Sequence, residues 1–264
     1  MSVITAPPVR SLVPALARQE AGRLLRHPLV LFGFGLWVWN AGLTIVDDGG
    51  PREAFQTVDS MLSFFPGMFL ILAANLVATR DGRAGSGELL TPAPGRLEER
   101  VRALLLASLA PALLGLVLVS ALHGYFLLDG RYEVAPTFWH LLQGPVTLFG
   151  ACALGIMLAE WIPARGTAVI AMVAMVLLNA WLGGLEDGML FGPMMTWPTW
   201  GLYADDWAGL FPGDAWGHVV YVVGLCGMAA TAALVRVSDR RRPVVVLGLL
   251  TVVVTVAGGI AQLP

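Results

Sequence analysis

Long apolar runs alternate along the chain with short polar segments, and seven of these runs are close to twenty residues in length. A helix of about 20 apolar residues crosses a hydrocarbon core that is roughly 30 Å thick. The pattern therefore predicts an all-α fold, a polytopic bundle of six core spans with a seventh, C-terminal span. The predicted spans cover residues 28–46, 60–79, 103–128, 138–159, 167–185, 218–235 and 244–263.

The basic residues orient this bundle. The chain has sixteen arginines and no lysine, and fourteen of the arginines lie in four segments between or before the spans. Cytoplasmic segments near span ends carry the excess of basic residues. This rule places the N-terminus in the cytoplasm and, with seven spans, the C-terminus outside. The four segments are residues 10–26, 80–102, the turn at Arg165, and 236–242, which leaves Arg52 and Arg131 for the outer side.

Composition supports a membrane protein, because 57% of the residues are hydrophobic and only 13% are charged, against about half and a quarter in soluble domains. The first apolar run begins at Pro28, after a polar lead, so we expect it to be retained as a span. Cys152 and Cys226 lie inside apolar runs and are predicted to be buried thiols. No basic or acidic tail suggests nucleic acid. Arginine without lysine, with abundant Ala, Gly and Val, suggests a bacterial cell membrane as the location.

The missing lysine also bears on catalysis. A nucleotide-binding P-loop needs a lysine after its glycines to reach the phosphates, so any ATP hydrolysis has to come from another polypeptide. The four histidines form no His-Glu-x-x-His pair, and Ser86, although flanked by glycines, has no histidine nearby in the sequence. The sequence predicts no enzyme, no catalytic residue, and no cofactor or metal site in this chain.

The segment 80–102 is the most informative polar stretch. Glycines at 82, 85 and 87 break the helix that leaves the second span, and Ser86 or Gly87 then caps a short turn that ends before Pro92. A second helix, with Glu98 and Glu99 in its first turn, leads into the third span. We expect a short helix held below the membrane.

This segment resembles the coupling loop of the permease subunits of ABC type-2 exporters, in which a Gly-x-Glu-x-Leu-like core is followed by a proline and an arginine. The N-terminal segment 9–27 is similar to the interfacial helix that precedes the first span in that family. The family plan has six spans with both termini inside, so the segment 244–263 is an added span. The residues that match the coupling loop, and that form the implied ATPase interface, are Gly85, Gly87, Glu88, Leu89, Leu90, Thr91, Pro92 and Arg96.

The resemblance implies a membrane-spanning subunit that exports an unidentified substrate. It implies a homodimer, or a pair with a second permease, working in the bilayer with a separate ATPase subunit that binds ATP and Mg. Two other classes stay open: a non-transporting membrane anchor or immunity protein, and a carrier driven by an ion gradient. An ordinary arginine-rich connection also accounts for the segment 80–102. A plain juxtamembrane anchor accounts for the N-terminal segment, because Glu20 and Arg23 interrupt its apolar side.

Polar residues inside the spans either line a pathway or bond across helices. No Asp or Glu lies near the middle of a predicted span, which disfavours a proton-coupled carrier, and Glu160 marks a cytoplasmic end. The external segment 186–217 is rich in aromatic residues and methionines, which fits an interfacial cap or a substrate gate. Kinks are expected at Pro66, Pro111 and Pro145, and close helix approach at Ala151 and Gly155. The candidate pathway residues are Asn40, Asn75, His123, His140 and Asn179.

Overall fold

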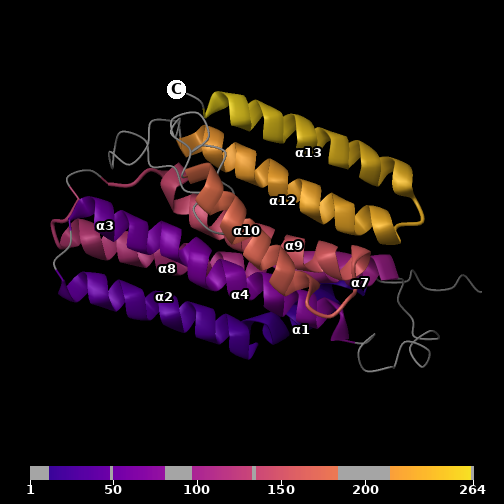
Figure 1. Cartoon of the computed structure of the whole chain (residues 1–264), viewed down its shortest axis with the longest axis horizontal. Helices are drawn as coiled ribbons and strands as arrows, with labels where there is room; N and C mark the ends of the chain where they lie inside the picture. Colours follow the sequence, from indigo (N-terminus) through magenta and orange to yellow (C-terminus); the bar gives the residue numbers. More distant parts are fainter. Residues whose placement is uncertain (1–11, 48–49, 81–96, 133–134, 184–214, 263–264) are drawn as a thin grey trace, which may run out of the picture.

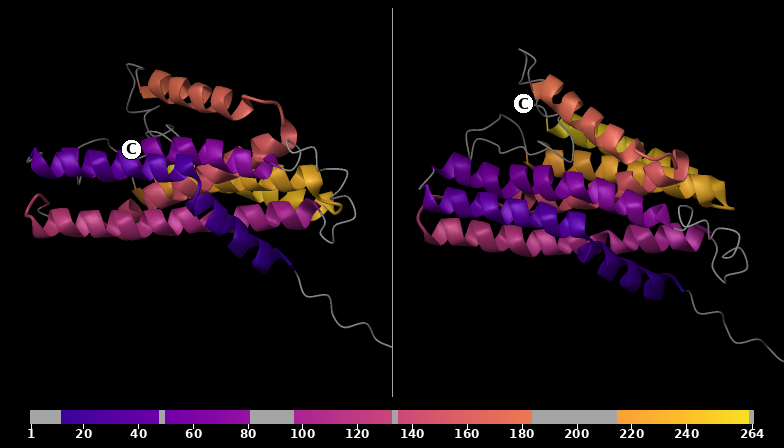
Figure 2. Two further views of the ribbon diagram at one scale, coloured as in Figure 1. Left: turned by 90° about the horizontal axis from the view of Figure 1, so that it is seen from below. Right: turned by 60° about the horizontal axis from the view of Figure 1, so that its bottom comes forward.

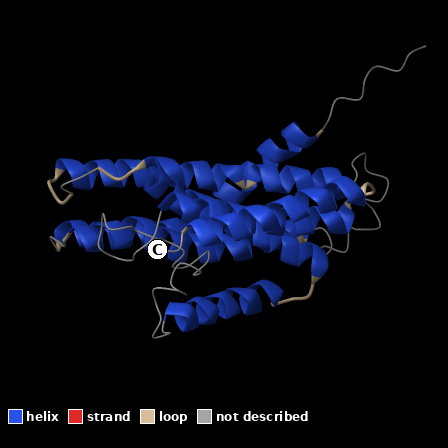
Figure 3. Ribbon diagram, turned by 90° about the horizontal axis from the view of Figure 1, so that it is seen from above, coloured by secondary structure: helices blue, strands red, loops and turns tan. Residues whose placement is uncertain are grey.

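The computed structural model describes residues 12–47, 50–80, 97–132, 135–183 and 215–262. Every regular element in these ranges is a helix (Figure 3), which confirms the predicted all-α class. The elements are α1 (Val13–Leu25), α2 (Pro28–Val46), α3 (Pro51–Phe55), the π-helix η1 (Gln56–Ser60), α4 (Met61–Ala78), α7 (Leu97–Ala107), α8 (Leu109–Leu128), α9 (Phe138–Trp161), α10 (Thr167–Gly183), α12 (Ala215–Val237) and α13 (Arg241–Ala261).

Six helical stretches in the described part of the chain are long and apolar enough to cross a membrane. The span predicted at 28–46 coincides with α2. Two predicted starts are wrong, because α3, η1 and α4 form one stretch from Glu53 to Ala78, and α7 and α8 form another from Leu97 to Leu128. Both stretches begin before the apolar runs. Helix formation depends on backbone hydrogen bonds, so a helix can include polar residues that precede an apolar run. The remaining three stretches are α9, α12 and α13.

The long helices form a row in which α2, α4, α9, α12 and α13 lie side by side in that order (Figure 1). Helix α8 packs against α9 on one face of the row, and α10 lies on the opposite face, apart from most of the bundle (Figure 2). The short α1 crosses one end of the bundle at an angle, where it packs on α7. The core runs through α4, α8 and α9, with Leu62, Leu148 and Ile156 fully buried.

We call the end of the bundle that holds Arg80, Arg100, Arg165 and Arg236 the arginine-rich end. Helices α9 and α12 both finish there, because Glu160 and Arg236 line one cavity. The chain therefore has to pass once to the opposite end between α9 and α12, and α10 is the described helix in that interval. Its described apolar part, Thr167–Leu178, is shorter than the six others. The predicted span 167–185 therefore stays a prediction, whereas the predicted C-terminal span 244–263 corresponds to α13, which is long and apolar enough to cross a membrane.

Helix α13 returns antiparallel along α12, and His218 at the start of α12 hydrogen bonds to Gln262 after α13, with 2.7 Å between His218 Nδ1 and Gln262 Oε1. Glycines permit this close approach, because a methyl group at Gly224 would lie 2.6 Å from the backbone nitrogen of Thr255. Helix α1 lies at the arginine-rich end, and the C-terminal end of the described chain lies at the opposite end of the bundle (Figure 1). An odd number of crossings is consistent with this arrangement.

The predicted features inside the spans have different outcomes. Pro66 and Pro145 lie within α4 and α9. Pro111 lies in the first turn of α8, just after the break at Ser108 that separates α7 from α8; its missing N–H and its ring disfavour a continuous helix there. Gly155 packs against the backbone of α4, with 3.1 Å from a methyl group built on it to Asn75 N. This contact confirms the predicted close approach.

Candidate functional site

A buried carboxylate lies at the end of the bundle opposite the arginine-rich end. Asp59 belongs to the π-helix η1, inside the stretch Glu53–Ala78, and its side chain is fully buried. Transfer of a charged group from water into a low-dielectric interior is costly unless it is paired and hydrogen bonded. A π-helical turn within an α-helix is rare and is often found at functional positions. Asp59 is therefore the residue around which we define a polar cluster.

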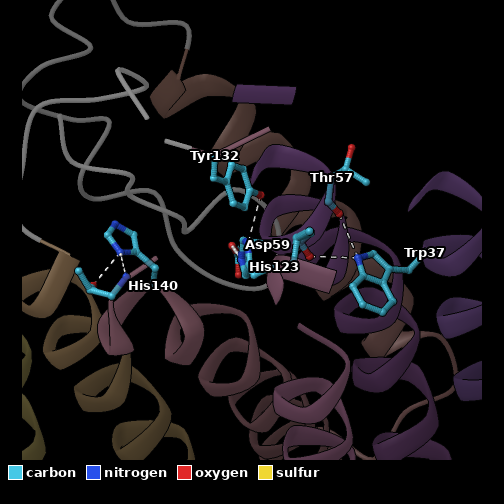
Figure 4. A network of polar contacts seen from close by, with 8 residues as sticks. Trp37, Thr57, Asp59, His123, Tyr132 and His140 are labelled. Atoms are coloured by element: carbon cyan, nitrogen blue, oxygen red, sulfur yellow. Dashed lines mark hydrogen bonds and ion pairs between the residues drawn. The ribbon is translucent and has the colours of Figure 1, made fainter. Parts of the chain in front are cut away.

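The partner of Asp59 is His123 on α8. His123 Nε2 lies 2.8 Å from Asp59 Oδ2, and His123 Nδ1 lies 3.1 Å from the hydroxyl of Tyr132 (Figure 4). Burial, together with the nearby Asp59 carboxylate, raises the pKa of the Tyr132 phenol above its ordinary value, while Arg131 acts in the opposite direction. A phenol that donates to Nδ1 leaves Nε2–H to donate to Asp59. The three side chains form a hydrogen-bonded chain from a phenol through an imidazole to a carboxylate.

This chain can hold or relay a proton. An imidazole between a donor and an acceptor exchanges the proton at one nitrogen for a proton at the other. Within the described residues Asp59 Oδ1 has no hydrogen-bond partner, so the carboxylate has an unused acceptor site. That oxygen faces Gly144 on α9, at 3.6 Å from a methyl group built there.

Neighbouring residues fix the position of the π-helix. The indole N–H of Trp37 on α2 donates to the carbonyls of Thr57 and Val58, each at 3.0 Å (Figure 4). The hydroxyls of Thr44 and Thr57 lie 2.8 Å apart. The indole of Trp37 thus holds two consecutive carbonyls of the π-helix, and the two hydroxyls join the same pair of elements, α2 and η1.

Arg131 closes the cluster from the loop after α8. Its guanidinium donates to the carbonyls of Thr44 and Ile45 at the C-terminus of α2, at 2.7 and 2.8 Å, and lies 5.1 Å from the centre of the Phe126 ring. A cation at a helix C-terminus interacts favourably with the orphan carbonyls and with the helix dipole. One arginine thus joins α2 to the α8 loop beside Tyr132.

Sequence reasoning missed Asp59, because the apolar run begins only at Ser60 and the acid before it reads as a loop residue. One signal could have found it: Phe55 and Val58 are three positions apart, as on one face of a helix, and both are buried. This spacing indicates that the helix of the span begins before Asp59. His123 is the one predicted pathway residue that joins the cluster directly.

The other predicted pathway residues are dispersed. His140 accepts from the backbone N–H of Thr137 at 3.1 Å, which caps α9, and stacks edge-on against Phe55 at 5.6 Å. Asn75 donates to the carbonyl of Gly155 at 3.1 Å and so bonds across α4 and α9. The carbonyl of Asn40 accepts from Thr44 on the same helix. The side chain of Asn179 lies outside the described residues. The described members of this set do not form one continuous path.

The arginine-rich end contains a second buried acid. Glu20 on α1 receives two hydrogen bonds from Arg80, at 2.7 and 2.8 Å, and one from Arg23 at 2.7 Å. Glu20 is only 4% exposed and faces inward with Leu24, so the acid that interrupts the apolar side of α1 is buried and paired. A fork-to-fork pair of this kind is directional as well as strong.

The predicted loop 80–102 is described only at its two ends. Arg80 belongs to the Glu20 pair, and α7 begins at Leu97 with Glu98 and Glu99 in its first turn, as expected. Arg100 donates to the carbonyl of Ala78 at 2.9 Å. The residues implied as the ATPase interface, 85–92 and Arg96, lie outside the described residues, as does most of the external segment 186–217.

The two cysteines are buried and unpaired with each other, as predicted. Among the described residues, no three His, Cys, Asp or Glu side chains lie together in a way that could hold a metal ion.

Together the helices define the class: an all-helical, multi-pass membrane protein. Comparison of the chain with family models, with curated proteins and with solved structures finds no match.

Proposed function

We propose that this chain is the membrane-spanning permease subunit of an ATP-driven ABC exporter in a bacterial cell membrane. It would work as a homodimer or with a second permease, and a separate ATPase subunit would bind ATP and Mg. The substrate is unassigned. The proposal rests on the resemblance of the segment 80–102 to a coupling loop, and the geometry at the two ends of that segment supports it.

The observation that carries the proposal is that both ends of the segment are fastened to helices. On the entry side, Arg80 is bound by the buried Glu20 of α1. On the exit side, Arg100 of α7 is bound to the last turn of α4 through the carbonyl of Ala78. Because α1 also packs on α7, a force applied to the segment reaches α1, α4 and α7 together. A loop whose ends made no contacts with the helices would not transmit the same force to them.

The orientation predicted from the arginines places this end in the cytoplasm. A cytoplasmic ATPase would meet the segment there. Closure of the ATPase would then push on Glu88, Leu89 and Leu90. Through the contacts of Arg80 and Arg100, this push would move α4 and α7 relative to the helices α9, α12 and α13.

The test is affinity purification of the tagged chain from its native membrane in mild detergent, followed by mass spectrometry. We expect a stoichiometric ATPase with a P-loop, lost in the Glu88→Arg variant. The matched control is Glu53→Arg, a charge reversal at an exposed residue of the opposite end, which should retain the ATPase. A wild-type preparation without any ATPase would favour a membrane anchor, an immunity protein or a gradient-driven carrier.

One observation favours a second candidate, the carrier driven by an ion gradient. The buried Asp59–His123–Tyr132 chain is a proton-binding arrangement inside a membrane-spanning stretch, and such residues often belong to proton pathways. The chain alone, reconstituted in liposomes with a pH-sensitive dye inside, would then move protons down an imposed gradient, and Asp59→Asn would abolish the flux. A proton flux into wild-type liposomes that is no larger than the flux into protein-free liposomes would count against this candidate.

A further inference from the structure

The π-helix η1 inserts a wide turn into one continuous helical stretch, Glu53–Ala78. A π-helical turn pairs residues that are five apart, whereas an α-helical turn pairs residues that are four apart. The wide turn therefore contains one residue more than an α-helix would need. If η1 became α-helical, the helix before it would turn by about 100° relative to α4, which is the rotation per residue of an α-helix.

Helix α4 is the fixed side of this turn. Its first turn buries Leu62 completely, and the hydroxyl of Ser63 lies 2.7 Å from the hydroxyl of Thr147 on α9. On the other side of η1, the helix α3 (Pro51–Phe55) has only five residues. Because a short segment loses fewer contacts than a long packed helix does, α3 is the side that would turn.

Contacts from α2 hold η1 in its wide form. The indole N–H of Trp37 donates to the carbonyls of Thr57 and Val58, each at 3.0 Å, and the hydroxyl of Thr44 lies 2.8 Å from that of Thr57 (Figure 4). Trp37 is fully buried, so its N–H depends on these two carbonyls for a hydrogen bond. A change to α-helical hydrogen bonding would move both carbonyls relative to the indole. Tertiary contacts thus maintain the π-helix.

The side chain of Phe55 directly precedes η1 and would turn together with α3. It is 1% exposed, and its ring centre lies 5.5 Å from that of His123 and 5.6 Å from that of His140. Phe55 therefore packs on the imidazole that joins Asp59 to Tyr132. With one residue fewer in the turn, position 56 would take the place of Phe55 opposite His140.

We propose that η1 is a register switch that converts between a π-helical and an α-helical form. Phe55 packs on His123 in the π-helical form and leaves it in the α-helical form. Loss of this packing opens the imidazole, and with it the pair of His123 and Asp59, to a proton donor. The gating of proton movement rests on the second proposed function, the gradient-driven carrier, whereas the switch itself requires neither an ATPase nor a gradient.

The experiment compares two double-cysteine variants of the full chain in lipid nanodiscs, with Cys152 and Cys226 replaced by alanine. One variant combines Phe55→Cys with His140→Cys, and the other combines Gln56→Cys with His140→Cys. Both are treated with the short thiol cross-linker dibromobimane, and the yield of linked product is measured by fluorescence. We expect the pair 55–140 to react in preference to the pair 56–140.

The perturbation is Trp37→Phe, which removes the indole donor and keeps an aromatic ring. It should lower the ratio of 55–140 product to 56–140 product about fivefold, the factor by which loss of one hydrogen bond changes an equilibrium. The matched control is Trp39→Phe on the same helix, at a side chain that is 69% exposed, and it should leave the ratio unchanged.

Deletion of Gln56 separates the switch from a general loss of stability in Trp37→Phe. It removes the extra residue of the wide turn, so η1 becomes α-helical while α3 keeps its register with α4. The yield of 55–140 product should therefore be restored when the deletion is added to Trp37→Phe. Failure of this restoration would contradict the switch.

Two further results overturn the proposal. An unchanged ratio in Trp37→Phe would mean that η1 keeps its register without the indole. Equal loss of both products would mean that α3 separates from α9 without a change of register. A shifted ratio, together with no proton flux into liposomes, would support the switch and refute the carrier, so the two failures are distinguishable.

Discussion

Removal of either member of the Asp59–His123 pair tests the protonation pattern proposed for the polar cluster. The two side chains are 0% and 2% exposed, with 2.8 Å between Nε2 and Oδ2. Loss of His123 leaves a buried carboxylate without its hydrogen-bond donor, which costs more than the roughly 1–3 kcal/mol of an unsatisfied neutral group. Loss of Asp59 leaves a neutral imidazole that still receives the Tyr132 hydroxyl, and one unsatisfied N–H costs about 1–3 kcal/mol. We therefore expect His123→Ala to destabilise the protein more than Asp59→Ala does.

The assay is the free energy of unfolding of both single variants and the double variant, from SDS titrations in mixed micelles monitored by circular dichroism. The double variant should be more stable than the sum of the single effects predicts, with an interaction energy of about 2–3 kcal/mol.

The matched control is the neutral pair Ser63–Thr147, which joins α4 to α9 through a fully buried hydrogen bond of 2.7 Å. Hydrogen bonds between spanning helices average about 0.6 kcal/mol. Additive effects at Asp59 and His123, or an interaction energy no larger than that of the control pair, would refute an energetic coupling between the buried carboxylate and the imidazole. A larger cost for Asp59→Ala would refute the neutral imidazole.

Three further perturbations test the packing and the helix caps. Gly155→Leu would force a side chain into the backbone of α4 near Asn75 and should cost about 1–3 kcal/mol or more in unfolding free energy. Arg131→Gln removes charged donors from two carbonyls at the end of α2 and should cost about 2 kcal/mol in the same titration. Burial lowers the pKa of His27 below its ordinary 6.5, so the unfolded chain binds more protons in that range, and stability should fall as the pH drops below about 6.5, measured as melting temperature against pH.

Each of these has a control. Gly35→Ala, at a helical glycine with open space around it, should not destabilise the protein, because alanine is favoured over glycine inside a helix; destabilisation there would contradict the close-packing argument. Arg242→Gln, an exposed arginine, should change stability by less than about 0.5 kcal/mol. His27→Asn keeps an oxygen that can accept from Leu29 N and should lose the pH dependence; an unchanged slope would contradict the role of His27.

The sequence predicted the features that depend on local pattern. The all-α class follows from apolar runs of membrane-spanning length, and α2, α9, α12 and α13 agree with their predicted ranges to within a few residues. The start of α7 near Glu98 was also predictable, because acidic residues are favoured in the first turn of a helix. The burial of Cys152 followed from its apolar surroundings.

The features that depend on long-range pairing were not predictable. Glu20 and Arg80 are sixty positions apart, and Asp59 and His123 are separated by sixty-four. From the sequence alone Glu20 interrupts an apolar face and Asp59 belongs to a loop, because a charged residue is expected outside unless its partner is known. The same limit applied to Arg100, Arg165 and Arg236, whose convergence on one cavity depends on which helices become neighbours.

The sequence by itself thus determined that the chain is helical, that it resides in a membrane, and which end of the bundle carries the arginines, since hydrophobic length and charge distribution are local quantities. Only the tertiary structure decided which charges are buried and what each contacts. A buried ionisable group is stable only with a partner at hydrogen-bond distance, and that distance is set by the packing of helices that are remote in sequence.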